Sequence, residues 1–249
     1  MMLKGLWKLT WVETKVFVRE PLGFAGTIGM PVILFLFAGR LFRSSPMDLA
    51  SATAAPIFNV AILAALLIAL GNVQSLVAII AIYREGGILK RLRATPLSPV
   101  TILSAQVVVK LAFALLSLGL LVLAGKRVLP GVMHVNLISF AAALLLSTLS
   151  ILSLGFILAS IVPTARFAQP IGTAVLYPML ALSGLFFPLD RLPAAVHVIA
   201  LGLPTTHAVA LMQGIWDGSG WGAHWMNAAA LVLFFAVFTA LSTKVFRWE

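Results

Sequence analysis

The sequence predicts an all-α membrane protein with six transmembrane helices. Of its 249 residues, 61% are hydrophobic and only 10% are charged, whereas a soluble domain carries about 25% charged residues. The apolar residues gather in long runs that approach the ~20 residues a helix needs to cross a bilayer. Nearly all of the Lys and Arg residues lie near the two termini or in the short segments between the runs. We therefore expect residues 1–249 to form a single membrane domain.

The first segment, residues 2–20, is amphipathic. Lys4, Lys8, Lys15 and Arg19 share one side at helical spacing, and the less polar side holds Leu3, Leu6, Trp7, Thr10, Thr14, Phe17 and Val18. This pattern predicts a helix that lies in the membrane interface with its Trp residues near the headgroups. A plain linker before the first span is the alternative.

The predicted spans are residues 22–41, 56–82, 100–125, 137–162, 167–189 and 225–245. Pro31 falls inside the first span and predicts a kink, because proline cannot donate a backbone hydrogen bond. The fourth span predicts close helix packing through its small residues Ser147, Ser150, Ser153, Gly155, Ala159 and Ser160.

The second span contains three amide residues, and the third contains one lysine. The amides of Asn59, Asn72 and Gln74 are expected to bond neighbouring helices in preference to a substrate. Lys110 lies near the cytoplasmic end of the third span, and its amine is expected to snorkel partly toward the interface.

Residues 190–221 fit neither a loop nor a span. Two apolar pieces, 192–203 and 205–216, flank Pro204, and each is too short to cross a bilayer. They predict a re-entrant helical hairpin on the outer side, between the fifth and sixth spans. With six spans, eleven Lys and Arg residues lie on the side of both termini and five on the other. The positive-inside rule therefore places both termini in the cytoplasm.

The sequence lacks the residues that ion coupling, hydrolysis, metal binding and nucleotide binding require. None of the acids, which are Glu13, Glu20, Asp48, Glu85, Asp190, Asp217 and Glu249, lies in a predicted span. This argues against an ion-coupled carrier or a membrane hydrolase. The four histidines lack metal-ligand spacing, and no basic patch is interleaved with aromatic residues, so we expect neither a metal site nor a nucleic-acid partner. The string nearest to a phosphate-binding loop has Arg127 where Ser or Thr is needed. We expect no enzymatic site and no bound cofactor.

The polar stretch 83–99, YREGGILKRLRATPLSP, separates the second and third spans. In a helix, Ile88, Leu89 and Leu92 would share one side, and basic residues would surround them. This layout is typical of a short helix that docks into a groove on a partner. A basic loop that only fixes topology is the alternative.

The stretch 84–99 resembles the signature of the permease subunits of type-2 ATP-binding-cassette (ABC) exporters. The shared features are the Arg84-Glu85 pair, a Gly, a Leu and a basic run that ends in Thr95-Pro96-Leu97. The segment 182–193, LSGLFFPLDRLP, and the terminal Phe246-Arg247-Trp248 also resemble that family. The chain departs from it at Gly86-Gly87, where members more often have a charged residue before a single Gly.

The resemblance implies a permease of the cell inner membrane that pairs with a second copy of itself or with a close relative. Two copies of a separate ATPase subunit would bind the ATP and Mg. The coupling helix would contact the ATPase through Arg84, Glu85, Gly87, Ile88, Leu89, Arg91, Leu92 and Arg93. The substrate path would lie between the first, second and fifth spans, with Met30, Phe35, Asn72, Tyr177, Met179 and Phe187 as candidate lining residues. Ordinary packing or lipid contact is the alternative role for each of these six.

The apolar interior without acids suggests an amphipathic or lipid-like cargo. The resemblance favours export of a drug or antibiotic. Export of a polysaccharide or lipid-linked glycan is the alternative within the family. An ion-coupled secondary carrier and a membrane scaffold protein are the alternatives from other classes.

Overall fold

The computed structural model describes residues 2–19, 25–43, 55–88, 99–128, 136–162 and 164–245, and these contain helices and turns but no strand. The first half forms α1 (Met2–Arg19), the π-helix η1 (Ala25–Gly29), α3 (Met30–Arg43), α4 (Ala55–Glu85), α6 (Pro99–Val128) and α7 (Leu137–Ile161). The second half forms α8 (Ala165–Ala181), the 3-10 helix η2 (Leu189–Arg191), α9 (Ala194–Leu201), α10 (Pro204–Trp216), α11 (Gly220–Ala223) and α12 (Trp225–Val245). The prediction of an all-α membrane protein is confirmed.

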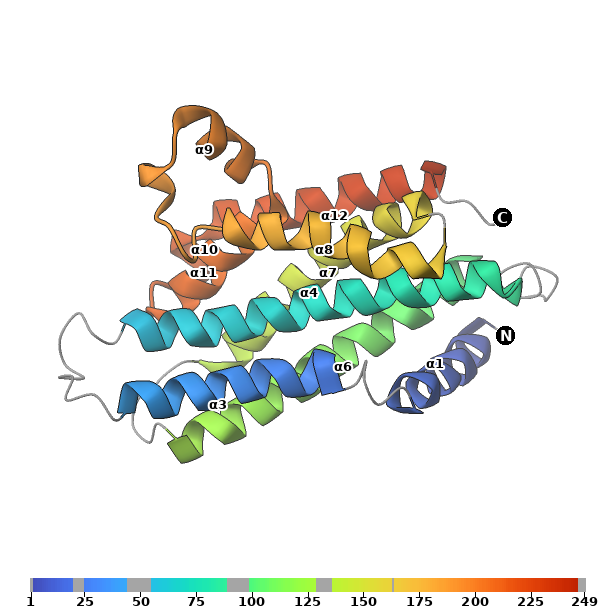
Figure 1. The fold of residues 1–249 in the computed structure, drawn as a ribbon, viewed down its shortest axis with the longest axis horizontal. Helices are drawn as coiled ribbons and strands as arrows, with labels where there is room; N and C mark the ends of the chain where they lie inside the picture. Colours follow the sequence, from blue (N-terminus) through green and yellow to red (C-terminus); the bar gives the residue numbers. More distant parts are fainter. Residues whose placement is uncertain are drawn as a thin grey trace.

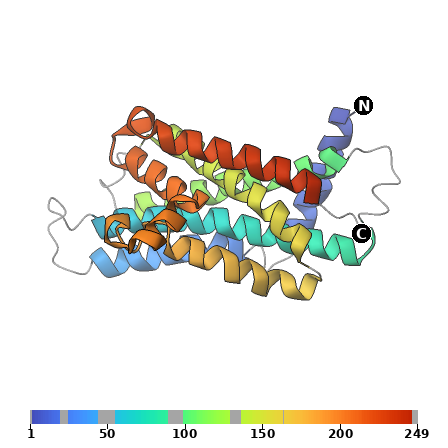
Figure 2. The same cartoon turned by 90° about the horizontal axis from the view of Figure 1, so that it is seen from above.

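The long helices run side by side along the long axis of the molecule (Figures 1 and 2). At one end, which we call the coupling end, α4 ends at Glu85, α12 ends at Val245, and α1 lies across the bundle (Figure 2). At the opposite end, the hairpin end, α9, α10 and α11 lie together (Figure 1). The predicted interface helix and the predicted hairpin thus occupy opposite ends of the bundle.

Four helices of the described chain are long and apolar enough to cross a membrane: Ile62–Glu85, Leu103–Arg127, Leu137–Ile161 and Trp225–Lys244. They correspond to the second, third, fourth and sixth predicted spans. The two other predicted spans have shorter helices. The first contains the apolar helical stretch Ala25–Phe37, and the fifth corresponds to α8, which has 17 residues. The count of six spans stays a prediction.

The sequence placed the end of the fifth span eight residues too late. The helix α8 ends at Ala181, where the N–H of Leu182 still donates to the carbonyl of Pro178 at 3.0 Å. Gly184 then adopts a φ of +85°, which is strained for any residue with a Cβ, and the chain turns there. The apolar run continues past this glycine, so hydropathy alone could not mark the helix end.

A π-helix lies just before Pro31, where the sequence predicted a kink in the first span. Because Pro31 has no N–H, the carbonyl of Thr27 cannot receive an α-helical bond from it. The chain forms the π-helical η1 over Ala25–Gly29 before α3 begins. Short π-helical segments occur frequently at functional sites.

The core is centred on α4 and α7, which pack closely. The predicted small residues Ser147, Ser150, Ser153, Gly155, Ala159 and Ser160 are all buried, as their role in close packing requires. A Cβ on Gly155 would lie 2.9 Å from Cγ1 of Val73, too close for any larger residue without displacement. The side chain of Asn136 caps α7 by accepting from the N–H groups of Ile138 and Ser139.

The segment predicted as a hairpin forms two helices, α9 and α10, bent by 79° relative to each other. Pro204 is the first residue of α10, where its missing N–H costs no helical bond. The hydroxyls of two neighbouring threonines tie α10 to its surroundings. Thr205 donates to the carbonyl of Met179 at 2.8 Å, and Thr206 donates to that of Ala200 at 2.6 Å.

Candidate functional site

The coupling turn, Glu85–Ile88, follows directly from α4. The N–H of Gly86 donates to the carbonyl of Ile82 at 2.9 Å, and Gly87 has a φ of +65°. Only glycine adopts that conformation without strain, so Gly87 redirects the chain where α4 ends. The predicted coupling residues Leu89, Arg91, Leu92 and Arg93 lie outside the described residues.

The remaining predicted coupling residues have distinct environments. Arg84 is half-buried, and its guanidinium donates to the carbonyl of Val162 at the end of α7. Glu85 and Ile88 are exposed. Arg84 therefore holds the end of α4 against α7, while Glu85 and Ile88 remain accessible from outside the monomer.

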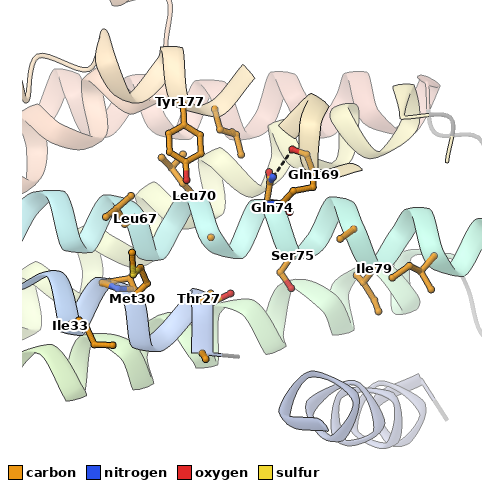
Figure 3. Close-up of a pocket in the computed structure, with 17 residues that line it drawn as sticks. Thr27, Met30, Ile33, Leu67, Leu70, Gln74, Ser75, Ile79, Gln169 and Tyr177 are labelled. Atoms are coloured by element: carbon orange, nitrogen blue, oxygen red, sulfur yellow. Dashed lines mark hydrogen bonds between the residues drawn. The ribbon is translucent and has the colours of Figure 1, made fainter. Parts of the chain in front are cut away.

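A cavity of about 740 Å³ lies between η1 and α3, α4 and α8 (Figure 3). These elements correspond to the first, second and fifth predicted spans. Its lining includes Thr27, Met30, Ile33, Leu67, Leu70, Gln74, Ser75, Ile79, Gln169 and Tyr177. No charged side chain is among its described lining residues, so the cavity offers apolar surface, hydroxyls and amides.

The predicted path residues divide between this cavity and other places. Met30 and Tyr177 line the cavity and are 61% and 56% exposed in the monomer. Phe35, Asn72 and Met179 are buried outside its lining, and Phe187 is exposed beyond the end of α8. That Met30 and Tyr177 contact cargo stays a prediction.

The predicted role of the amides as helix bonds holds for Gln74. Its Nε2 donates to the carbonyl of Gln169 at 2.9 Å (Figure 3). The same Nε2 donates to Oγ1 of Thr173 at 3.2 Å, and both bonds join α4 to α8. A Cβ on Gly172 would lie 2.0 Å from Oε1 of Gln74, so the close approach of the amide requires this glycine. Asn72 is fully buried, and neither its Oδ1 nor its Nδ2 has a hydrogen-bond partner among the described residues. The side chain of Asn59 lies outside the description.

A second polar cluster, the α1 seam, joins α1 to α4 and α6. Glu13 is 4% exposed, and its Oε2 accepts a hydrogen bond from the hydroxyl of Tyr83 at 2.8 Å. Burial raises the pKa of Glu13 above the ordinary 4.5, although the Tyr83 hydroxyl and the Lys110 charge act in the opposite direction. The inward face of α1 thus carries a buried acid, and the tryptophans Trp7 and Trp11 are exposed.

The structure corrects the expectation that Lys110 snorkels. Lys110 is 2% exposed, its Nζ donates to Oγ of Ser75 at 2.6 Å, and it lies 4.2 Å from the ring centroid of Phe17. The Phe17 ring also packs on Phe113, with centroids 4.4 Å apart. The amine is held inside because α1 covers it and supplies an aromatic face as a partner.

The sequence pointed to this seam only weakly. Glu13 lies three residues from Thr10 and four from Phe17, so it shares the less polar side of the predicted interface helix. The sequence analysis also missed Thr27, Ser75 and Gln169 as cavity residues. A single hydroxyl or amide in a span does not indicate which side of the helix faces a cavity.

Comparison with known proteins identifies the family of the chain. Residues 4–216 match the model of the family described as "ABC-2 type transporter". The inner membrane transport permease YhhJ of Escherichia coli is 30% identical over 169 residues, which cover 66% of this chain and 44% of that protein. Nodulation protein J of Rhizobium leguminosarum bv. viciae is 31% identical over 99 residues, covering 40% of this chain and 38% of that protein.

The match to each of these relatives spans less than half of the relative's length. The family model, in contrast, covers most of this chain, including α1, the cavity between α3, α4 and α8, and the end of α4. This protein therefore belongs to the ABC-2 type transporter family.

Proposed function

We propose that the chain is the membrane-spanning permease of an ATP-driven exporter. Its membrane is the cell inner membrane, with the coupling end and both termini in the cytoplasm. Two copies of a separate ABC ATPase subunit bind ATP and Mg and act on the coupling turn. A second permease, identical or closely related, completes the assembly.

One observation carries this proposal: α4 contributes to the wall of the 740 Å³ cavity and also ends at the coupling turn. A single helix thus links the exposed surface at Glu85 and Ile88 to the cavity between α3, α4 and α8. Membership of the family supports the assignment of an ATPase to that surface.

The lining favours an amphipathic or lipid-like cargo. Met30, Ile33, Leu67, Leu70 and Ile79 offer apolar contact, and methionine adapts to varied shapes. The absence of charge among the described lining residues disfavours a strongly ionic cargo, which would lose its hydration without a counter-charge. A drug or antibiotic is therefore the first candidate.

A lipid-linked glycan is the second candidate. The hydroxyls of Thr27, Ser75 and Tyr177 and the amides of Gln74 and Gln169 give the same cavity a polar side. Sugar hydroxyls pair readily with such groups, and a lipid anchor would occupy the apolar side.

Transport by sealed, inside-out vesicles that contain the permease and its ATPase tests the proposal. Uptake of a fluorescent amphipath should require ATP. Ala78→Trp places a large ring among the lining residues and should lower uptake severalfold, because the ring takes up space that the cargo needs. Ala236→Trp on the exposed face of α12 is the matched control and should leave uptake near the wild-type rate. Uptake that persists without ATP and vanishes when the proton gradient collapses would instead establish a secondary carrier.

A further inference from the structure

Ser75 in α4 lines two cavities. It belongs to the lining of the cavity of about 740 Å³, as does Ile79. The same two residues line a much smaller cavity inside the α1 seam, together with Glu13 and Lys110. Ser75 and Ile79 therefore form the partition between the large cavity and the buried charges of the seam. Figure 3 shows Ser75 on the opposite side of α4 from Tyr177.

The hydroxyl of Ser75 accepts one hydrogen bond and donates none within the described part of the chain. Nζ of Lys110 donates to its Oγ at 2.6 Å. A serine inside a helix commonly donates to the carbonyl four residues earlier, as Ser117 donates to Phe113 at 2.8 Å. Because the ammonium of Lys110 occupies the seam side of Oγ, the O–H of Ser75 is available on the side of the large cavity.

The bond from Lys110 makes Ser75 a stronger donor. Successive hydrogen bonds polarise one another, so an ammonium that donates to a hydroxyl draws electron density away from its O–H. The same bond uses one of the two lone pairs of Oγ, which makes Ser75 a poorer acceptor for a second donor. Ser75 therefore favours an acceptor in the cavity, and a negatively charged oxygen makes the strongest such bond.

The charges of the seam are arranged with the ammonium toward the cavity. Lys110 is one hydrogen bond behind the lining, whereas Glu13 bonds to Tyr83 and is not among the described lining residues. A cargo oxygen that accepts from Ser75 at an ordinary distance of about 2.7 Å would come within about 5 Å of Nζ of Lys110. At this range the buried ammonium attracts an oxyanion and repels an ammonium on the cargo.

The amide of Gln74 does not reverse this preference. Its Nε2 is already bonded to Gln169 and Thr173. Its Oε1 is buried against Gly172 and has no hydrogen-bond partner among the described residues. No carboxylate belongs to the described lining, so a cationic cargo would lose its hydration without a counter-charge.

The apolar part of the lining fixes how such a cargo would lie. Leu70 and Leu67 precede Ser75 on α4 by five and eight residues, or about 8 and 12 Å along the helix at 1.5 Å per residue. Both lie on the hairpin side of Ser75, and Met30 and Ile33 of α3 line the same cavity. An amphipath with its acidic end at Ser75 would therefore extend its apolar body toward the hairpin end.

We propose that Ser75, with Lys110 behind it, is the subsite that binds a singly charged oxyanion on the cargo, such as a carboxylate or a phosphodiester. This inference rests on the proposed function, and it narrows the cargo to amphipaths with an acidic end. The counter-charge lies one hydrogen bond behind the lining. A single negative charge is therefore accommodated, whereas an ion of several charges is not.

Binding of three fluorescent probes to the full-length permease in nanodiscs tests the subsite, with empty nanodiscs as the background. The probes share one alkyl chain and one fluorophore, and they end in a carboxylate, a methyl phosphodiester or a primary amine. Both oxyanions should bind about tenfold more tightly than the amine, because the bond to a charged acceptor is strong and the amine is repelled. The tighter of the two oxyanions identifies the head group, and either order supports the subsite.

Substitutions separate the hydroxyl from the charge behind it. Ser75→Ala should remove most of the preference for oxyanions, and Ser75→Thr should retain it. Ser117→Ala, a buried serine that is not among the lining residues, is the matched control and should also retain it.

Lys110→Met is made in the Glu13→Gln background, so that no buried charge is left without a partner. Glu13→Gln alone should keep the preference, and addition of Lys110→Met should abolish it. A purely structural role of the seam would instead change the affinity for all three probes alike.

Equal affinity for the amine and the oxyanions in the wild type would overturn the subsite, as would an unchanged preference in Ser75→Ala. Uptake of the same probes by the inside-out vesicles keeps this inference separate from the proposed function. If the oxyanions bind with the stated preference but no probe is taken up with ATP, the proposed function fails and the subsite stands.

Discussion

Removal of the Tyr83 hydroxyl should loosen α1 from the bundle. In Tyr83→Phe, the buried Glu13 loses the donor that lies 2.8 Å from its Oε2, while the ring of residue 83 keeps its packing. A hydrogen bond to a charged group contributes about 1.5–3 kcal/mol. We therefore expect the equilibrium for detachment of α1 to rise by about 10- to 150-fold, at 1.4 kcal/mol per factor of ten.

Hydrogen exchange of the α1 amides in nanodiscs measures this equilibrium, because detachment exposes that helix before the bundle unfolds. Glu13→Gln supplies the control background. The Gln side chain has nearly the same shape but no charge, so Tyr83→Phe should cost only about 0.5–1.5 kcal/mol there. The difference between the two backgrounds isolates the bond between Tyr83 and Glu13.

The pH dependence of the same measurement follows from the raised pKa of Glu13. Docked Glu13 binds its proton more tightly than free Glu13, so attachment of α1 is strongest below the ordinary pKa of 4.5 and weakens as the pH rises through the raised value. Glu13→Gln should remove this dependence. Equal α1 protection in the wild type and in Tyr83→Phe at neutral pH would refute the seam as an anchor.

Two further substitutions test the coupling turn and the cavity wall. Ile88→Asp should weaken the binding of the ATPase by about 2 kcal/mol or more, measured by copurification, since it places a charge in the proposed contact. Ile88→Ala should have a smaller effect. If Ile88→Asp retains the ATPase, Ile88 is not part of that contact. Gly172→Ala should lower stability by about 1–3 kcal/mol, because its Cβ displaces Gln74 from two hydrogen bonds. Gly119→Ala, whose Cβ meets no atom within 4 Å, is the matched control and should be neutral or stabilising in a thermal melt.

The four long spans could be predicted because the bilayer sets their length and the sequence records it as apolar runs. The orientation of each helix within the bundle could not. Lipid and protein interior are both apolar, so helices such as α12 are hydrophobic on the exposed and on the buried side alike. For that reason the sequence could not tell which residues of α3, α4 and α8 face the cavity: Met30 and Tyr177 line it, whereas Phe35, Asn72 and Met179 do not.

The contacts of the α1 seam could not be predicted from the sequence either. Glu13 and Lys110 read as separate charges, one in an interface helix and one near the end of a span. The packing of α1 on α6 brings both of them inside, and α4 supplies the hydroxyls of Tyr83 and Ser75 as their partners. A contact between residues so far apart in the chain leaves no trace in local periodicity.

The unbroken course of α4 allows it to act as a lever. Its 31 residues contain no proline beyond the first turn and extend for about 46 Å at 1.5 Å per residue, well beyond the ~30 Å of bilayer hydrocarbon. If the helix pivots near Ala55, a sideways displacement of about 3 Å at Glu85 moves Gln74 by about 2 Å, in proportion to its distance along the rod. A displacement of the coupling turn would thus move the cavity wall in the same direction, because α4 rotates as one stiff body. The same rotation would strain the bonds of Gln74 to α8 and of Tyr83 to α1.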